Sequence, residues 1–376
     1  MKVTEITTHM IKLDFTAWYE DRPKPDTEPR FWYYPLICLS TDEGIEGYSM
    51  GYGVVGCGHA NASLIHDVYY HHVVGHDPLC HEAIWQNIRR LNRHLYGITD
   101  TIQAELDVAL WDIKGKVAGL PIATLLGKVR DKVPLYASLP PHLIETPEAL
   151  EKSVKAKKAA GYSGIKLQPL GGPASVIPRL HLAREIVGPD FPLMIDSSAE
   201  LTFVEALAIG RELDTLKYLW FEEPIPDRQI NQLKKLADDI ETPVLAAETV
   251  RLHELPQYLI QGALDIARGD VHLKGGITGL CKALAMCELM GYELEIHTAA
   301  SPIIDVANLH VACASELSRF VEAHHPIFRF AIKDNPLEVD EDGYQRLPQK
   351  PGLGIELDWD WIDDNTEKVI KGYTSA

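Results

Sequence analysis

The sequence predicts an α/β protein in which a parallel (β/α) barrel of the TIM type follows an α+β N-terminal region. Eight short apolar segments recur between residues 133 and 322, and helical patterns separate most of them. Repeated strand–helix units favour parallel pairing with right-handed crossovers, and eight such units are enough to close a barrel. An ionisable side chain follows six of the segments, as expected for barrel enzymes, whose active sites lie at the C-terminal strand ends.

The first 60 residues have the pattern of strands and turns. "YYPLICLSTDEGIEGYSMGYG" contains an apolar run, a turn at TDEG and a second strand rich in glycine, which predicts a hairpin. Residues 61–120 are mostly helical in pattern, and "TDTIQAELDVALWDIKGKVAG" combines helical spacing with a capping glycine. We predict an N-terminal capping domain over residues 1–125.

Two loops of this region contain aromatic residues. The polar, proline-rich stretch within Trp18–Tyr34 reads as exposed, and Tyr48–His59 follows the hairpin. Aromatic side chains in loops often serve only packing, but they also line lids over binding sites. We expect substrate specificity to lie in these two loops.

The barrel is predicted over residues 126–340. Its strand candidates are VPLYAS, GIKLQP, PLMID, YLWFEEP, TPVLAAE, LDIARGD, YELEIH and RFVE. Stretches such as TFVEALAIGRELDTL and ITGLCKALAMCELMG supply the intervening helices. The glycine- and proline-rich segment 341–376 is expected to return to the N-terminal domain.

Composition narrows the class of protein. A net charge of −18 would repel a phosphate backbone, so nucleic acid is not an expected partner. No apolar run approaches the ~18 residues of a membrane span, and the N-terminus lacks the apolar core of a signal peptide. Six scattered cysteines without a CxxC pair predict reduced thiols in a cytoplasmic protein. We expect a homo-oligomer that acts on a small-molecule carboxylate.

Three consecutive strand ends carry carboxylates, namely Asp196, Glu222 and Glu248. Each acid alone could be the N-cap of the next helix, but the regular series favours convergence on one site. Three clustered carboxylates need a cation, and oxygen-only ligands suit Mg²⁺ better than zinc. Strand alternation would turn Glu223 to the opposite side, so a salt bridge on the outer layer of the barrel is expected for it.

Asp270 and His297 follow the next two strands and would be neighbours in a barrel. A carboxylate beside an imidazole fixes its tautomer and raises its basicity. A lone histidine is more often structural, but beside three metal-binding carboxylates His297 is predicted to be a general base. The histidines of YYHH and AHHP have no such context and are expected to be surface or packing residues.

Lys166 and Gln168 in "GIKLQP" share one face of a strand, because side chains alternate with period two. This face could be a solvated surface. The apolar flanking strands favour instead a face that points into the barrel.

These residues, in this order, resemble the enolase superfamily and specifically its mandelate racemase-like branch. The similarity covers nearly the whole chain through TDEGIEGY, AELDVALWDIKGKVAGLP, MID, FEEP, AAE, GDVHLKGGITG and EIH. Asp270 assigns the branch, because the muconate-lactonizing type has a lysine five residues before GG. The resemblance implies a modified (β/α)₇β barrel, a capping domain with specificity loops, and Mg²⁺-assisted removal of a proton next to a carboxylate. It also implies that Glu322 is an acid near the substrate carboxylate.

The chain departs from the family pattern at two positions. The usual Lys-x-Lys is Lys166-x-Gln168, and Ser198 stands where many members carry asparagine. Glutamine is not a useful proton acceptor, so inversion with a base on each face becomes harder. We expect Gln168 instead to bind substrate through a hydrogen bond to one of its hydroxyl groups, or to hold Lys166 in place. Dehydration needs one base and one acid, and a single histidine can serve as both in turn.

We therefore expect a Mg²⁺-dependent dehydratase of a sugar acid. His297 would take the alpha proton through a metal-stabilised enediolate, and loss of the beta hydroxyl would give a 2-keto-3-deoxy acid. The alternatives are a racemase, epimerase or cycloisomerase in which Lys166 is the second base, and a non-catalytic binding protein that kept the barrel.

Overall fold

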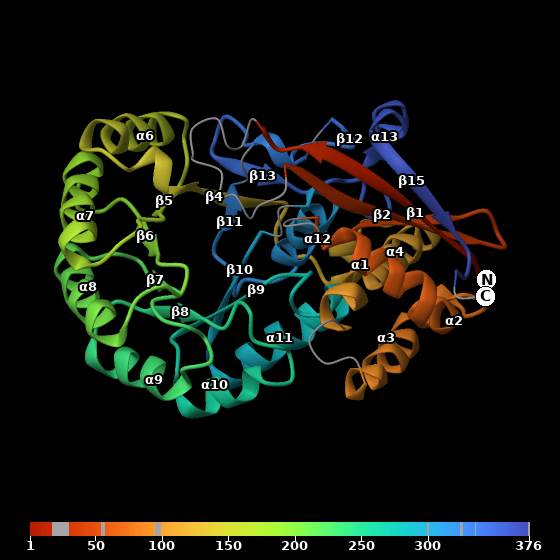
Figure 1. Cartoon of the computed structure of the whole chain (residues 1–376), viewed down its shortest axis with the longest axis horizontal. Helices are drawn as coiled ribbons and strands as arrows, with labels where there is room; N and C mark the ends of the chain where they lie inside the picture. Colours follow the sequence, from red (N-terminus) through yellow and green to blue (C-terminus); the bar gives the residue numbers. More distant parts are fainter. Residues whose placement is uncertain are drawn as a thin grey trace.

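A ring of parallel strands lies at the centre of the left-hand part of the molecule in Figure 1. The computed structural model describes residues 1–16, 30–53, 57–94, 99–298, 301–323, 326–334 and 336–374. The ring strands are β4 (Lys132–Leu139), β5 (Gly164–Leu167), β6 (Leu193–Asp196), β7 (Phe221–Glu222), β8 (Val244–Ala246), β9 (Ile266–Gly269), β10 (Glu293–Ile296) and β11 (Val321–Ala323). They pair in the order β10-β9-β8-β7-β6-β5-β4-β11, so each of the eight predicted strands is confirmed.

Seven helices follow the first seven ring strands and lie outside them (Figure 1). They are α6 (Pro147–Ala159), α7 (Pro173–Val187), α8 (Phe203–Leu216), α9 (Ile230–Asp239), α10 (Leu255–Gln261), α11 (Gly276–Met290) and α12 (Pro302–Cys313). Seven strand–helix units and a final strand make the predicted (β/α)₇β arrangement. Between β10 and β11 a side chain closes the ring, because Ser318 Oγ accepts a hydrogen bond from the Ile296 amide at 3.1 Å.

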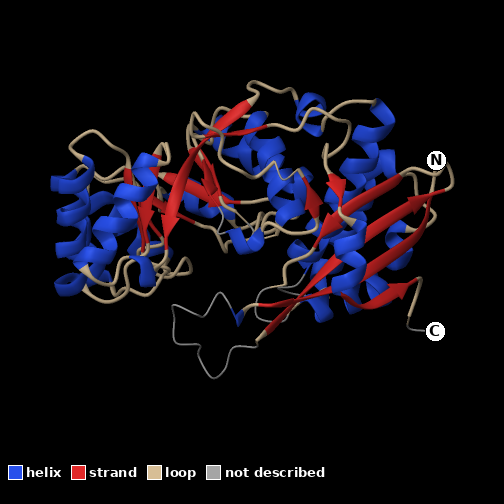
Figure 2. Cartoon of the chain, turned by 90° about the horizontal axis from the view of Figure 1, so that it is seen from above, coloured by secondary structure: helices blue, strands red, loops and turns tan. Residues whose placement is uncertain are grey.

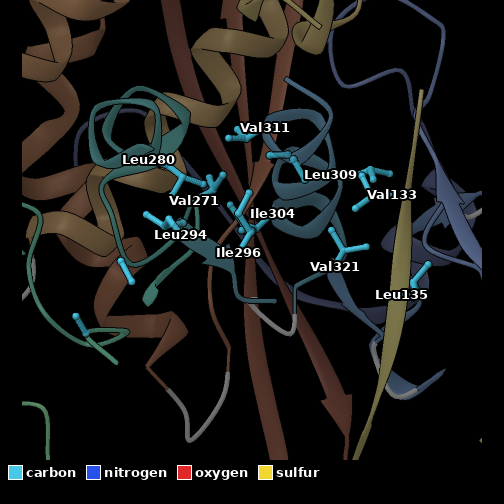
Figure 3. Close-up of a cluster of buried hydrophobic side chains, with 14 of the residues drawn as sticks. Val133, Leu135, Val271, Leu280, Leu294, Ile296, Ile304, Leu309, Val311 and Val321 are labelled. Carbon is cyan, nitrogen blue, oxygen red and sulfur yellow. The ribbon is translucent and has the colours of Figure 1, made fainter. Parts of the chain in front are cut away.

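Strand alternation separates packing from chemistry. On β10, Leu294 and Ile296 point outward and pack with Ile304 of α12 in the core shown in Figure 3. Glu295 and His297 alternate with them and point into the ring. The side chains at the N-terminal level of the ring interior are apolar: Tyr136, Met194, Trp220, Leu245 and Ile266 form a separate buried cluster. The barrel is therefore filled at this level, and its polar residues lie one layer nearer the C-terminal strand ends.

The N-terminal region is an antiparallel sheet covered by helices (Figure 2). Its strand order is β15-β1-β2-β3, with β1 (Val3–Asp14), β2 (Phe31–Thr41), β3 (Glu46–Met50) and β15 (Thr366–Lys371). The helical part consists of α1 (Gly58–Leu64), α2 (Tyr70–Val73), α3 (His81–Arg90), α4 (Thr99–Ala118) and α5 (Ile122–Leu126), with short turns at Ile65–Tyr69, Pro78–Cys80 and Leu91–Arg93. The predicted hairpin is confirmed, and Gly44 in its turn has the left-handed φ of 76°.

The segment after the barrel has contacts with both regions. It contains β12 (Ile332–Lys333), β13 (Tyr344–Arg346), β14 (Glu356–Leu357) and α13 (Trp359–Asn365) before β15. β13 pairs with barrel strand β4, and β15 pairs with β1. The domain boundaries at residues 125/126 and 340/341 stay a prediction.

Neither a membrane span nor a disulfide is found in the described part of the chain. None of its helices combines the length and the apolar character needed to cross a bilayer. No disulfide joins any of the six cysteines there.

Candidate active site

The eight predicted site residues all lie at or just after the C-terminal ends of ring strands. Lys166 and Gln168 belong to the end of β5, Asp196 ends β6, Glu222 ends β7, Glu248 follows β8, Asp270 follows β9, His297 follows β10, and Glu322 lies in β11. Contacts between 2.8 and 3.8 Å link all of them into one network. The interpretation of Lys166 as an inward-facing residue is therefore confirmed.

The Lys166 ammonium lies between three carboxylates. Its Nζ is 3.0 Å from Glu222 Oε2, 3.3 Å from Asp196 Oδ2 and 3.2 Å from Glu322 Oε1. Burial opposes the charged form, but Glu222 and Glu322 outweigh it and raise the pKa of Lys166 well above its ordinary value. An ammonium in this position is a permanent positive charge and a hydrogen-bond donor.

Arg268 on β9 is a second buried cation, and our sequence analysis did not identify it. Its Nη2 donates to Glu322 Oε2 and to the Tyr136 hydroxyl, both at 2.8 Å, and lies 3.0 Å from Glu222 Oε1. The signal was available, because period two places residue 268 on the same strand face as Asp270. The apolar residues before Arg268 in LDIARGD indicate a buried strand, and arginine is rarely buried in such a strand.

Glu322 accepts hydrogen bonds from Tyr136 Oη, Lys166 Nζ and Arg268 Nη2, all at the oxygen Oε2. Burial opposes ionisation, but the two cations outweigh it and hold the pKa of Glu322 well below its usual range. In this arrangement Glu322 is an anion that orients two cations. The catalytic role near the substrate carboxylate that the resemblance implies for Glu322 stays a prediction.

The carboxylates at this end of the barrel exceed the permanent cations. In the described part of the chain, the four carboxylates Asp196, Glu222, Glu248 and Glu322 contact two permanent cations, Lys166 and Arg268. His297 lies 3.7 Å from Glu248, but its charge is balanced by its partner Asp270. The surplus of two negative charges equals the charge of one divalent cation. Oxygen donors on adjacent strands fit a hard ion such as Mg²⁺.

The described residues do not hold three such side chains already gathered into metal-binding geometry. Lys166 occupies the space between Asp196 and Glu222 instead. Among Asp196, Glu222, Glu248 and Glu322, Glu248 is the least compensated, because its nearest cationic atoms are His297 Nε2 at 3.7 Å and Arg268 Nε at 3.8 Å. The donor chemistry therefore fits the cation, with Glu248 as the ligand that most needs it.

The prediction for Glu223 is wrong. Its carboxyl group faces the pocket side, where burial and the neighbouring carboxylates of Glu248 and Asp196 raise its pKa to about 9. No ion pair of Glu223 is found within the described ranges. The reason is local backbone geometry: Glu223 has a left-handed φ of 41°, so strand alternation ends at Glu222.

Asp270 and His297 form the predicted dyad. Asp270 Oδ2 and His297 Nδ1 are 2.8 Å apart, which leaves Nε2 as the reactive nitrogen on the side of Glu248. Burial disfavours the imidazolium, but Glu248 and the Asp270 hydrogen bond outweigh it and raise the pKa of His297 to about 9. Asn308 of α12 fixes both strand ends, because it accepts from the Val271 amide and donates to the His297 carbonyl.

Gln168 Nε2 donates a hydrogen bond to Asp196 Oδ2 at 3.2 Å, and no hydrogen bond joins Gln168 to Lys166 within the described ranges. The second Asp196 oxygen accepts the Ser198 amide at 2.8 Å. The amide of Gln168 therefore orients a predicted metal ligand, and its predicted contact with a substrate hydroxyl stays a prediction.

A buried lysine holds the loop that carries Glu248. Lys274 Nζ donates to the carbonyl groups of Ala247, Glu248 and Val250 at 2.8, 2.9 and 2.5 Å. Ala247 has a φ of 74°, so the chain turns sharply just before the ligand. Three carbonyl groups use all three N–H bonds of the ammonium.

The capping domain reaches this end of the barrel through a buried carboxylate. Glu105 of α4 accepts a hydrogen bond from Asn61 at 2.6 Å and lies 3.8 Å from Nε2 of His272, two residues after Asp270. The His272 ring packs against Tyr52 with centroids 5.2 Å apart. The predicted specificity loops are described only in part, because residues 17–29 and 54–56 lie outside the described ranges. His324 and His325 of AHHP also lie outside them.

Comparisons with known proteins agree with this geometry. Residues 149–361 match the family model described as enolase C-terminal domain-like. Residues 32–127 match the model for the N-terminal domain of mandelate racemase and muconate lactonizing enzyme. Together the two matches cover most of the N-terminal region and every ring strand except β4.

Curated relatives align over most of their length. The chain is 32% identical to arabinonate dehydratase of Saccharolobus solfataricus, over 86% of this chain and 89% of that protein. It is 28% identical to D-galactarolactone cycloisomerase of Agrobacterium fabrum, over 97% and 98%. Among solved structures, D-glucarate dehydratase of Agrobacterium tumefaciens complexed with magnesium superposes with a TM-score of 0.86 at 28% identity, over 98% of this chain and 100% of that chain.

Proposed function

The chain belongs to the enolase superfamily, in its mandelate racemase-like branch, and from this premise we propose that it is a Mg²⁺-dependent dehydratase of a sugar acid. The observation that carries the proposal is the single available base. Asp270 orients Nδ1 of His297, and Nε2 points to the side of Glu248 at 3.7 Å, whereas Lys166 is tied to three carboxylates as an ammonium. The names of the arabinonate and glucarate dehydratases support the reaction class.

The residues divide the work of elimination as follows. His297 Nε2 takes the proton from the carbon next to the carboxylate, and Asp270 stabilises the imidazolium that results. The same imidazolium then returns a proton to the beta hydroxyl, which leaves as water. The enol product takes up a solvent proton at the former beta carbon and becomes a 2-keto-3-deoxy acid.

The remaining residues bind and orient. Asp196, Glu222 and Glu248 would hold Mg²⁺, which when bound stabilises negative charge developing on the substrate carboxylate. Lys166 adds a fixed positive charge near that carboxylate. Gln168 orients Asp196 and offers an amide, not a base, on the β5 side of the pocket.

A deuterium experiment tests this proposal. The protein with Mg²⁺ would be screened against a library of aldonic and aldaric acids for keto-acid formation, and the productive acid would be incubated in D₂O. We expect product formation and unreacted acid of unchanged configuration. Recovery of inverted acid would show a second competent base and would refute the one-base dehydratase. His297→Asn should abolish both product and exchange.

The second candidate is a cycloisomerase, which the similarity to D-galactarolactone cycloisomerase favours over a racemase. Such a reaction also needs only one base, because an intramolecular oxygen leaves in place of water. Adding the corresponding lactones to the screen separates the two candidates, since a lactone substrate would give an isomer of equal mass and a sugar acid would lose water. Parental turnover after metal removal would contradict both candidates.

A further inference from the structure

We propose that Arg268 is a positioning residue that sets the net charge of the carboxylate pocket, so that the pocket holds one divalent cation and still accepts an anionic substrate. The inference rests on the proposed metal ligands Asp196, Glu222 and Glu248. It adds a residue that is neither a ligand nor a base.

The geometry of Arg268 supports this role. The side chain is fully buried, and its guanidinium contacts Glu222 at 3.0 Å and Glu322 at 2.8 Å. Tyr136 Oη and the Ile296 carbonyl accept further hydrogen bonds at 2.8 and 3.4 Å, which fix the plane of the group. Arg268 Nε has no hydrogen-bond partner among the described residues and lies 3.8 Å from Glu248 Oε2. Arg268 thus faces two of the three proposed ligands.

Charge balance explains why an arginine is placed here. Arginine does not lose its proton in proteins, so it offsets one negative charge under all working conditions. Without it, four carboxylates would face Lys166 alone, and the surplus would rise from two charges to three. A cation would then bind more tightly, and the protein would repel a carboxylate substrate more strongly.

Removing the charge of Arg268 should have opposite effects on the affinity for the cation and on the affinity for the anion. Arg268→Met removes the charge at similar length, and Arg268→Lys keeps the charge. Tyr136→Phe is the matched control, because it removes a hydrogen bond to the same Glu322 oxygen without changing charge. Titration calorimetry would measure the Kd of Mg²⁺ alone on the metal-free protein. The Kd of tartronate, a small 2-hydroxy dicarboxylate, would then be measured on the Mg²⁺-loaded protein.

We expect Arg268→Met to bind Mg²⁺ at least about fivefold more tightly and tartronate at least about fivefold more weakly. For Arg268→Lys and Tyr136→Phe, the Kd of Mg²⁺ should stay within about threefold of the value for the parent protein. If Arg268 only supported the fold, Arg268→Met would weaken the binding of both Mg²⁺ and tartronate. Unchanged or weaker Mg²⁺ binding by a folded Arg268→Met protein would overturn the proposal.

A mirror variant keeps the proposal testable if Arg268→Met does not fold. Glu322→Gln removes one negative charge at a residue that is not a proposed ligand, and we expect it to weaken Mg²⁺ binding by about fivefold. Tighter or unchanged binding would count against the charge argument. Absence of Mg²⁺ binding to the parent would refute the metal assignment of the proposed function instead.

Discussion

At the scale of single residues, the basicity of His297 depends on two neighbouring carboxylates. Asp270 and Glu248 raise the pKa of His297, so the free imidazole forms only as the pH rises toward about 9. A cation bound at Glu248 would lower that pKa. Activity should therefore have an ascending limb below pH 9, with the neutral imidazole on its alkaline side.

Asp270→Asn should move this limb to lower pH, because an amide no longer stabilises the imidazolium. The plateau rate should fall by about 10²–10⁴-fold, since the imidazole loses its orientation and basicity. The measurement is the pH dependence of alpha-deuterium exchange, with the parent as reference. A limb that stays in place would show that Asp270 does not set the pKa of His297.

Lys274 gives a second prediction at this scale. Lys274→Met would leave the carbonyl groups of Ala247, Glu248 and Val250 without their donor, at a cost of about 1–3 kcal/mol per buried group. We expect a lower melting temperature and weaker Mg²⁺ binding together. Lys282→Met on the neighbouring helix breaks an exposed ion pair with Glu82. It should change the free energies of unfolding and of Mg²⁺ binding by no more than about 1 kcal/mol each.

Sequence reasoning identified most of the site residues that follow strand periodicity, with Arg268 as the exception, and it failed at Glu223, where periodicity ends. Lys166, Asp196 and Glu222 obey alternation and were placed correctly. Glu223 was misplaced because a left-handed residue cannot be recognised from a non-glycine letter. Arg268 obeyed alternation and was missed, because buried arginines are rare enough that a strand position did not suggest one.

At the scale of elements, helix α4 packs so closely on β3 that a glycine is required. A Cβ at Gly47 would lie 2.1 Å from the carbonyl oxygen of Ala109. Gly47→Ala should therefore push the helix from the strand and cost about 1–3 kcal/mol or more. Chemical denaturation would measure the loss.

Ser49→Ala on the same strand is the control for Gly47→Ala. Ser49 Oγ is buried without a hydrogen-bond partner in the described part of the chain, so its removal should be neutral or slightly stabilising. Equal losses of unfolding free energy in both variants would show that β3 tolerates no substitution, and would contradict the steric explanation.

Element types and order were largely predictable, because strand–helix repetition and capping signals are local. The pairing of short strands in the tertiary structure was harder to predict. Residues 344–346 form β13 against β4, although their sequence shows no alternating apolar run. The short stretches Ile332–Lys333 and Glu356–Leu357 pair only with one another. Such pairs of two or three residues are set by neighbouring packing, which sequence periodicity does not record.

At the scale of the whole molecule, the last strand holds the N-terminal sheet to the end of the chain. β15 covers the edge of β1, and His66 Nδ1 lies 2.7 Å from the Gly372 carbonyl oxygen. Deleting residues 366–376 would expose the β1 edge and remove that partner. We expect a lower melting temperature and concentration-dependent association, measured by calorimetry and light scattering.

Deleting only residues 375–376 is the control, because both lie beyond β15. It should leave melting and association unchanged. A 366–376 deletion that melts like the parent and stays dispersed would show that β15 does not protect the sheet.

The two faces of β10 also bear on how this protein can diversify. Leu294 and Ile296 pack in the hydrophobic core, while His297, which follows the strand on the alternate face, is the base of the proposed function. Substitutions on the outer face therefore alter cellular abundance with little change in rate per molecule, and substitutions on the inner face do the reverse. Laboratory evolution can therefore treat the two sets as separate libraries and combine the best variants of each. Stabilising substitutions on the outer face would offset the stability that is lost when new activity is selected on the inner face.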